Sequence, residues 1–313
     1  MVDMKNSRVL KRTSILGVPV DIVTLDHVSS ILDDWTDSLS FHTVFVREVG
    51  SLMLTYEKKS LLDLHKKADL VVPDGMPLVW IAKLRGYGRE IDRVAGADLM
   101  ARICKDSIVT KKSHYFYGGL PGVAEDLADK LSSMYPGLII AGVFSPPMRD
   151  IDEGFTATSE ILDEIANIKY SKADYIWIGI SSPKQEYFMM KAAPLIGRGV
   201  FIGVGAAFDF LSGRSARAPR WMQRFGLEWL FRFMCEPRRL RRRYLVLAPR
   251  FVVHVFVEQI LKRWTGTQRI THQKRDKEGD VEPVKSSPIA SRGKPFKPYE
   301  RVVNDYDAQI YKN

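Results

Sequence analysis

Residues 174–186 read DYIWIGISSPKQE, an apolar run that breaks abruptly into small and polar residues. This pattern predicts a buried strand followed by a loop and a helix. In open α/β sheets, loops of this kind at the carboxyl ends of the strands bind ligands. The first N–H groups of the following helix have no helical partners and can hold an anion. The loop at 181–186 is therefore a candidate ligand site.

The same pattern recurs along the chain. Residues 200–205 read VFIGVG, residues 70–72 form an apolar run that stops at Pro73, and residues 114–117 lead into a glycine turn. Strand and helix patterns alternate without a repeat period, which is typical of a mainly parallel sheet. The sequence thus predicts a Rossmann-like α/β domain over residues 1–210, with helices flanking the sheet.

Positive charge is concentrated after this domain. The chain carries a net charge of +10, and residues 211–263 alone hold thirteen Lys or Arg against three Glu, an excess of the same size. Such a segment indicates a polyanionic partner: ligand phosphates, anionic lipid headgroups or nucleic acid.

Hydrophobic residues follow the arginines at 244–257, where Pro249 and Arg250 interrupt them. The run is shorter than the ~20 apolar residues of a spanning helix. It favours a helix that lies in the membrane interface, within a basic amphipathic appendage over residues 211–264. The polar residues 265–313 predict a disordered tail.

The remaining composition indicates a cytoplasmic protein. Residues 1–12 are polar and lack the apolar core of a signal peptide. Cys104 and Cys235 lie in apolar patterns without CxxC spacing, so both are expected to be buried thiols in a reducing compartment.

Two glycine turns could bring the backbone close to a phosphate. Residues 118–124 read GGLPGVA, and residues 203–208 read GVGAAF. Neither is a GxGxxG fingerprint, so a dinucleotide site is not expected. The alternative is that each turn only provides tight strand-to-helix geometry.

Asp74 stands where the apolar run at 70–72 ends. From the end of a strand its carboxylate can project into the crevice of the sheet and accept a proton from a hydroxyl group. The alternative is that Asp74 caps a helix that begins near Met76.

Metal signals are weak. Residues 150–152 read DID, but no strand precedes them, and a solvated turn is the preferred interpretation. The six histidines show no metal-ligand spacing. No cofactor or metal is expected.

Five ordered blocks carry a family resemblance: VPDGMPLVW at 72–80, GGLPGVA at 118–124, SPKQE at 182–186, GVGAAFD at 203–209, and RAP, GLEWL and EPRR within 217–239. Together they resemble the WecG/TagA/CpsF glycosyltransferases, glycosyltransferase family 26, over roughly residues 14–245. The resemblance implies an inverting enzyme that moves a sugar from a UDP-sugar to a polyprenyl-diphosphate-linked saccharide such as an undecaprenyl-diphosphate-linked one. It also implies that no metal is obligatory.

The resemblance implies a role in exopolysaccharide, capsule or other cell-surface polymer synthesis, with the protein attached peripherally to the inner face of the plasma membrane. Residues 211–264 would close the site and contact the anionic membrane. A homo-oligomer is left open, and no nucleic acid is expected as a partner.

The candidate site residues fall into three groups, of which Asp74, Gln185, Arg232, Arg239 and Arg242 are carried over by position from the resemblance. The resemblance makes Asp74 the general base and places Gln185 against the donor sugar or the attacking group. The residues assigned to the UDP-sugar are Gly118, Gly119, Gly122, Val123, Ser182, Pro183, Lys184, Gly205 and Asp209. Those assigned to the diphosphates are Arg232, Arg239 and Arg242. Guanidinium groups suit this task because they bind phosphate oxygens in a planar fork.

The chain departs from the family at residues 46 and 48, where Val46 and Glu48 replace the Thr and Asn that many members carry. The identity of the donor sugar is therefore not transferred. Two other functions stay open: a nucleic-acid-binding module that uses the arginines and aromatics, and an inactive scaffold of a polymer-synthesis complex.

Overall fold

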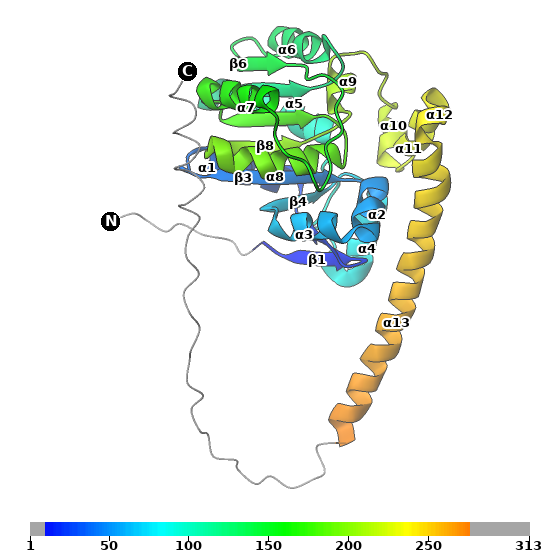
Figure 1. The fold of residues 1–313 in the computed structure, drawn as a ribbon. Coiled ribbons are helices and arrows are strands. Elements are labelled where there is room, and N and C mark those ends of the chain that lie inside the picture. Colours follow the sequence, from blue (N-terminus) through cyan, green and yellow to red (C-terminus); the bar gives the residue numbers. More distant parts are fainter. Residues whose placement is uncertain (1–9, 276–313) are drawn as a thin grey trace, which may run out of the picture. The chain divides into compact units, whose positions relative to one another are not determined.

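The computed structural model describes the backbone of residues 10–275 and the side chains of residues 10–261. The chain divides into two units, Met1–Lys262 and Arg263–Asn313. The first unit contains the sheet and its helices (Figure 1). Of the second unit, only the end of the last helix is described.

Six parallel strands form the central sheet, in the order β4-β3-β8-β7-β5-β6. Their bounds are β3 (Phe41–Arg47), β4 (Leu70–Pro73), β5 (Ser113–Gly118), β6 (Ile139–Phe144), β7 (Tyr175–Gly179) and β8 (Gly199–Gly203). A separate antiparallel hairpin precedes them, made of β1 (Arg12–Ile15) and β2 (Val18–Asp21). The structure confirms the predicted α/β fold.

The helices of the domain are α1 (Leu25–Thr36), α2 (Val49–Glu57), α3 (Lys59–Lys67), α4 (Met76–Ala82), α5 (Gly96–Thr110), α6 (Val123–Met134), α7 (Ser159–Ser171), α8 (Lys184–Ile196) and α9 (Ala207–Leu211). After them come α10 (Arg220–Arg224), α11 (Glu228–Cys235), α12 (Pro237–Arg241) and α13 (Ala248–Arg275). The described residues also contain two π-helical segments, Lys83–Tyr87 and Arg242–Leu247.

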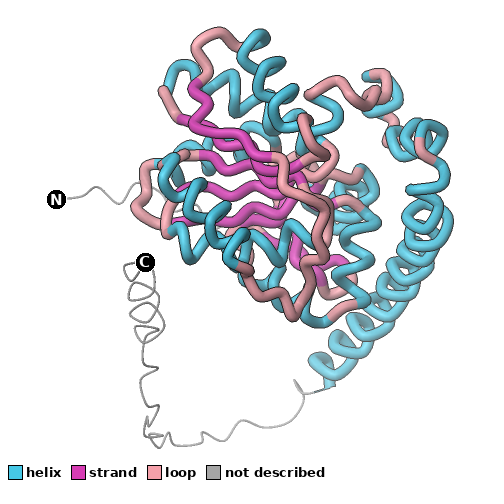
Figure 2. The backbone as a smooth tube through the Cα atoms, turned by 45° about the horizontal axis from the view of Figure 1, so that its top comes forward, coloured by secondary structure: helices cyan, strands magenta, loops and turns pink. Residues whose placement is uncertain are grey.

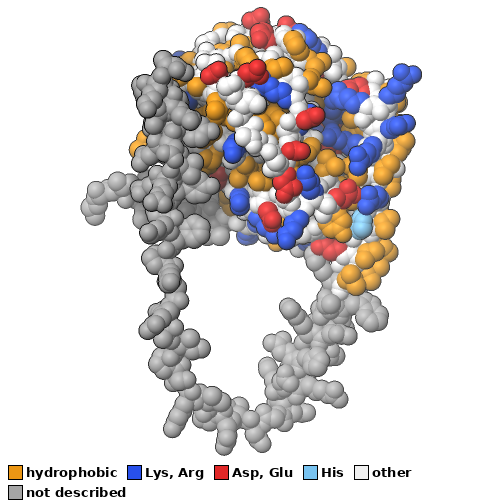
Figure 3. Space-filling view, viewed as in Figure 1, with side chains coloured by type: hydrophobic (Ala, Val, Ile, Leu, Met, Phe, Trp, Pro, Cys, Tyr) orange, Lys and Arg blue, Asp and Glu red, His pale blue; other side chains and the backbone are white. Residues whose placement is uncertain are grey.

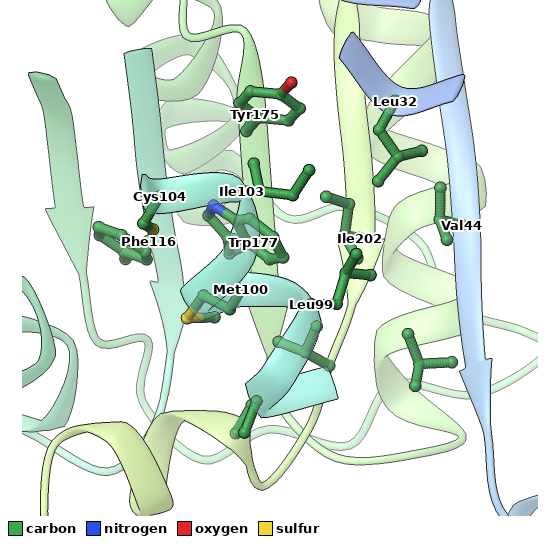
Figure 4. Packing of buried hydrophobic residues seen from close by; sticks show 14 of the residues in the cluster. Leu32, Val44, Leu99, Met100, Ile103, Cys104, Phe116, Tyr175, Trp177 and Ile202 are labelled. Atoms are coloured by element: carbon green, nitrogen blue, oxygen red, sulfur yellow. The ribbon is translucent and has the colours of Figure 1, made fainter. Parts of the chain in front are cut away.

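The sheet lies between two helical layers, as Figure 2 shows. Strand side chains alternate between faces: Val44 belongs to the buried cluster that includes residues of α1, α5 and α6, whereas Phe45 belongs to the cluster that includes residues of α3, α7 and α8. Both faces are apolar because a parallel sheet is covered on both sides. Trp177 is fully buried in the first face, next to Phe116 and Met100 (Figure 4).

A crevice is expected where neighbouring strands send their helices to opposite faces. Helix α6 leaves β5 on one face of the sheet, and α8 leaves the adjacent β7 on the other. The two strand ends approach closely: the N–H of Gly119 donates to the carbonyl of Gly179 at 3.0 Å. A Cβ on Gly118 would lie 2.6 Å from the backbone of Gly179, so a larger residue would push the strands apart.

The C-terminal helices pack against the hairpin. Leu247 and Phe251 are buried with hairpin residues and with side chains of α2 and α4. The backbone is helical without a break from Pro237 through Pro249, and the π-helical segment Arg242–Leu247 lies just before Pro249. Within the described residues, Pro237–Leu261 is long and apolar enough to cross a membrane, judged by length and composition only.

Three expectations need correction here. Pro249 does not interrupt the helix, so the run is longer than the sequence pattern indicated; at 1.5 Å per residue it spans about 37 Å. Cys235 is exposed rather than buried, because α11 turns part of its apolar surface outward; Cys104 is buried as expected. Helix α13 continues past residue 265 to Arg275, and the rest of the predicted tail, 276–313, lies outside the described residues.

Candidate active site

A cavity of about 1180 Å³ opens at the carboxyl edge of the sheet. The loops after β3, β4, β5, β7 and β8 form one side, and residues from 214 to 252 form the other. Ligand pockets usually measure about 300–1,000 Å³, so this one has room for a nucleotide-sugar and part of a second substrate. Figure 3 shows Lys and Arg mixed with hydrophobic side chains over the C-terminal helices beside it.

Most of the site residues predicted from sequence line this cavity. They are Asp74, Gly119, Val123, Ser182, Lys184, Gln185, Gly205, Asp209, Arg232 and Arg239. The structure therefore brings together segments that are far apart in the chain. The individual roles assigned to these residues stay predictions.

Four predicted residues do not line the cavity. Gly118 joins β5 to β7, Pro183 precedes α8, and Gly122 begins α6 at φ 83°, where an added Cβ would lie 2.9 Å from the Arg214 guanidinium. Arg242 is exposed, and its neighbour Arg243 lines the cavity instead. Arg242 and Arg243 follow Arg239 at spacings of three and four, which both favour the same helix face, so the packing of the segment decides which of them reaches the cavity.

Asp74 is held at the end of β4 by its backbone. Its N–H donates to the carbonyl of Arg47 at 2.7 Å. Asp74 does not cap α4, which was the alternative role. The N-cap residue of α4 is Gly75, and no side chain makes a capping hydrogen bond there. The carboxylate, 28% exposed, instead accepts from Arg93 at 3.1 Å.

The surroundings make the Asp74 carboxylate more basic than usual. Burial raises its pKa, and the nearby negative charges of Glu228 and Glu48 raise it further, while Arg93 opposes them. Arg93 is shared, since it also donates to Glu228 of α11 at 2.5 Å. A carboxylate with a raised pKa and an open face is suited to accept a proton.

Gln185 lies in the first turn of α8 and is 3% exposed. Its Nε2 donates to the neighbouring Glu186 at 3.0 Å. Beneath them Arg47 pairs with Glu186, and both side chains are buried. Burial lowers the pKa of Arg47 to about 9, which still leaves the guanidinium protonated at neutral pH.

Arginines from the C-terminal segment face the strand loops. The Arg232 guanidinium lies 5.2 Å from the ring centroid of Phe210. Among the described residues it makes no ion pair, whereas Arg239 pairs with Glu236 and Arg243 lies 3.6 Å from Glu48. This wall therefore offers positive charge opposite Asp74.

Comparison with known proteins identifies the family. The model of the glycosyl transferase WecG/TagA/CpsF family matches residues 13–265. The chain belongs to this family.

Two Bacillus proteins named N-acetylglucosaminyldiphosphoundecaprenol N-acetyl-beta-D-mannosaminyltransferase are similar to it. The B. spizizenii protein is 32% identical over 188 residues, which cover 60% of this chain and 68% of the relative. The B. subtilis protein is 26% identical over 251 residues, 77% of this chain and 93% of the relative.

Within this WecG/TagA/CpsF glycosyl transferase, Glu48 has a structural task. It caps α2 by accepting from the N–H groups of Gly50 and Ser51, each at 2.7 Å. Burial would raise its pKa, but Arg243 and these two donors outweigh burial and lower it. Glu48 therefore stays ionised and links the cavity wall to the C-terminal segment, while Val46 adds an apolar surface to the same wall.

Arg93, Glu228 and Arg243 were missed in the sequence. Arg93 ends the charged stretch 89–93, and Glu228 belongs to the GLEWL block, but neither shows its partner in the sequence. Arg243 belongs to the same run of arginines as Arg242, and helical spacing from Arg239 does not separate the two.

No group of three or more His, Cys, Asp or Glu within the described part of the chain could hold a metal. Asp150 of the DID sequence is fully exposed and pairs with Lys184 at 3.2 Å. Lys184 thus lines the cavity with its ammonium group directed to the 149–150 loop. Metal independence stays a prediction.

Proposed function

We propose that this glycosyl transferase moves a sugar from a UDP-sugar to a saccharide carried on a polyprenyl diphosphate, with inversion at the anomeric carbon. The observation that carries the proposal is that Asp74 and Arg232 line one cavity. Both Bacillus relatives carry names that describe transfer to a diphosphoundecaprenol-linked sugar, which supports the acceptor class.

In the proposed reaction, Asp74 takes the proton from the attacking hydroxyl of the acceptor. The hydroxyl oxygen forms the new glycosidic bond as the bond from the anomeric carbon to the phosphate oxygen breaks. Attack opposite the leaving group inverts the anomeric centre. UDP leaves with the bonding electrons, and no further reactant is needed.

The leaving UDP gains negative charge, which cationic groups must stabilise. Arg232, Arg239 and Arg243 lie on the wall opposite the strand loops and can supply this charge. Removing one such group from a preorganised site typically costs about 10²–10³-fold in rate. Asp209 lies close to them; burial raises its pKa and the charge of Arg239 counteracts this.

We further propose that the C-terminal segment rests on the cytoplasmic face of the membrane in an exopolysaccharide or other cell-surface polymer pathway. Its exposed large hydrophobic side chains are Trp221, Phe225, Trp229, Met234, Leu245, Val246, Val252, Val253, Phe256, Val257, Ile260 and Leu261. Exposed arginines accompany them, including Arg220, Arg238 and Arg250. Each basic residue near an anionic surface contributes about 1 kcal/mol. This arrangement would deliver a lipid-linked acceptor to the cavity.

The test is to incubate the protein with a panel of UDP-sugars and a short-chain polyprenyl-diphosphate-linked sugar, and to weigh the products by mass spectrometry. One added hexose or N-acetylhexosamine is expected, with release of UDP. UDP binding without any product would favour a scaffold. Tight, salt-dependent binding to a DNA or RNA oligonucleotide without UDP binding would favour the nucleic-acid module.

A further inference from the structure

A fully buried ion pair lies directly behind the cavity. Arg47 at the end of β3 and Glu186 in α8 are both 0% exposed. Ser182 joins them: its hydroxyl accepts from Arg47 at 2.8 Å and donates to Glu186 at 3.0 Å. Burying two charges costs free energy, so a buried ion pair is weak evidence that the pair stabilises the fold.

Here the pair orients the side-chain amide of Gln185. Gln185 Nε2 donates to Oε1 of Glu186, the same oxygen that Arg47 contacts. An ionised carboxylate can only accept hydrogen bonds, so turning the amide over would place two acceptor oxygens together. The amide orientation is therefore determined by charge.

The consequence is an acceptor oxygen left at the cavity wall. Oε1 of Gln185 is buried and has no hydrogen-bond partner among the described residues. It lies beside Gly205, where an added Cβ would be 3.7 Å away, and both residues line the cavity. A buried acceptor without a partner is unfavourable and is satisfied when a donor group binds.

The same arginine also supports the predicted base. The carbonyl of Arg47 accepts from the N–H of Asp74 at 2.7 Å, while its side chain holds Glu186 and Ser182. Arg47 thus links the strand end that carries Asp74 to the loop that carries Gln185. A phosphate is unsuited to the Gln185 oxygen, because both groups are acceptors at neutral pH.

We infer that Arg47 and Glu186 are positioning residues that present Oε1 of Gln185 to a hydrogen-bond donor, a hydroxyl or amide N–H, on a sugar bound in the cavity. This inference rests on the proposed function, because it takes the ligand to be a sugar nucleotide with its acceptor. It adds that the buried pair of Arg47 and Glu186 determines which atom of the Gln185 amide faces the sugar.

The kinetic test uses Gln185→Met, Glu186→Gln and the double variant, with whichever UDP-sugar of the panel turns over. Gln185→Met is expected to lower kcat/KM roughly 10- to 100-fold while UDP binding, measured by calorimetry, changes less than twofold. The double variant should be no worse than Gln185→Met, because Glu186 acts through Gln185. Losses that multiply, or UDP binding that falls in parallel, would overturn the inference.

The substrate whose KM rises identifies the sugar. A higher KM for the UDP-sugar places the donor group on the transferred sugar, and a higher KM for the acceptor places it on the acceptor saccharide. Glu186→Gln leaves Arg47 unpaired and can unfold the protein. The neutral pair Arg47→Met with Glu186→Met removes both charges, and it should reproduce the kinetic loss of Glu186→Gln at a melting temperature close to that of the wild type.

A second measurement does not depend on turnover. Nuclear magnetic resonance of ¹⁵N-glutamine-labelled protein should show slow solvent exchange for the Gln185 side-chain amide, assigned by its loss in Gln185→Met. In the neutral pair the same amide should exchange fast, because its hydrogen-bond acceptor on residue 186 is gone. Fast exchange in the wild type would sink the inference even if the enzyme is active. If the panel shows neither UDP binding nor transfer, the proposed function fails together with the sugar assignment, and the exchange data still judge the amide orientation.

Discussion

The strand-end loops and the C-terminal segment build the two walls of one cavity by different means. In the loops, polar groups are buried and joined by hydrogen bonds, as between Arg47, Ser182 and Glu186. In the C-terminal segment, Arg232 stacks on Phe210 and Arg239 makes an ion pair that is largely exposed. Large hydrophobic side chains of that segment are exposed as well.

The difference indicates a division of tasks. Buried, mutually hydrogen-bonded groups hold reacting atoms in fixed positions, which suits the base and the sugar contact. Exposed ion pairs contribute little to stability, so their arginines can exchange protein partners for ligand phosphates at small cost. We therefore expect substitutions in the loops to act on the chemical step, and substitutions in the C-terminal segment to act on diphosphate and membrane binding.

The largest effect is expected for Asp74→Asn. Removing a general base lowers the rate by roughly 10²–10⁴-fold, so transfer should fall about 1,000-fold with UDP binding unchanged. Product formation followed by mass spectrometry measures the loss. Asp26→Asn, at an exposed carboxylate that pairs with Arg102, is the matched control and should keep full activity. Near-normal transfer by Asp74→Asn would remove the base from the proposed mechanism.

Arg232→Ala should have the next largest effect, about a 100-fold loss of transfer together with weaker UDP binding, because it removes a cation from the site of the leaving diphosphate. Arg242→Ala tests the two placements of charge against each other. If Arg242 held the diphosphate, as the sequence-based assignment has it, Arg242→Ala would lose transfer and UDP binding to a comparable degree. Because Arg242 is exposed, we expect both to change less than twofold. Calorimetry with UDP distinguishes them.

The membrane contact should respond to charge on the exposed face of α13. Val253 and Phe256 are 61% and 65% exposed, so Val253→Glu with Phe256→Glu should leave folding and UDP binding intact. Sedimentation with phosphatidylglycerol-containing vesicles should weaken roughly tenfold or more, since apolar area is lost and repulsion added. Tyr170→Glu, at an exposed position of α7, is the control and should sediment like the wild type. Unchanged sedimentation of the double variant would argue against this face as the contact.

The smallest effect concerns pH. Because the pKa of Asp74 is raised, the base is lost as pH falls through a value above the ordinary 3.9 or so, and kcat/KM should decline there. Glu228→Gln removes a negative neighbour and leaves Arg93 to Asp74 alone, so both changes lower the pKa of Asp74. The acid limb of the profile should therefore shift to lower pH. Glu90→Gln, at an exposed carboxylate that pairs with Lys11 and does not contribute to the Asp74 shift, should leave the acid limb in place. A shift to higher pH in Glu228→Gln would contradict the electrostatic assignment.

Local pattern was sufficient for the elements and for most of the cavity. Apolar runs that stop at Pro73, Gly118 and Gly179 identified strand ends, and the carboxyl ends of parallel strands meet at one edge. Neither the helix through Pro249 nor the exposure of Cys235 followed from local pattern, because both depend on which surface of the C-terminal helices packs on the domain.

The sequence by itself determined the α/β class, the family and the strand ends that carry Asp74 and Gln185, because these depend on periodicity and on the order of short blocks. Only the tertiary structure decided which charges meet. Arg93 contacts both Asp74 and Glu228, and Glu228 lies 135 positions after it in the chain. Arg47 pairs with Glu186, which lies 139 positions after it. Such pairs depend on how distant segments pack, and no local spacing encodes their partners.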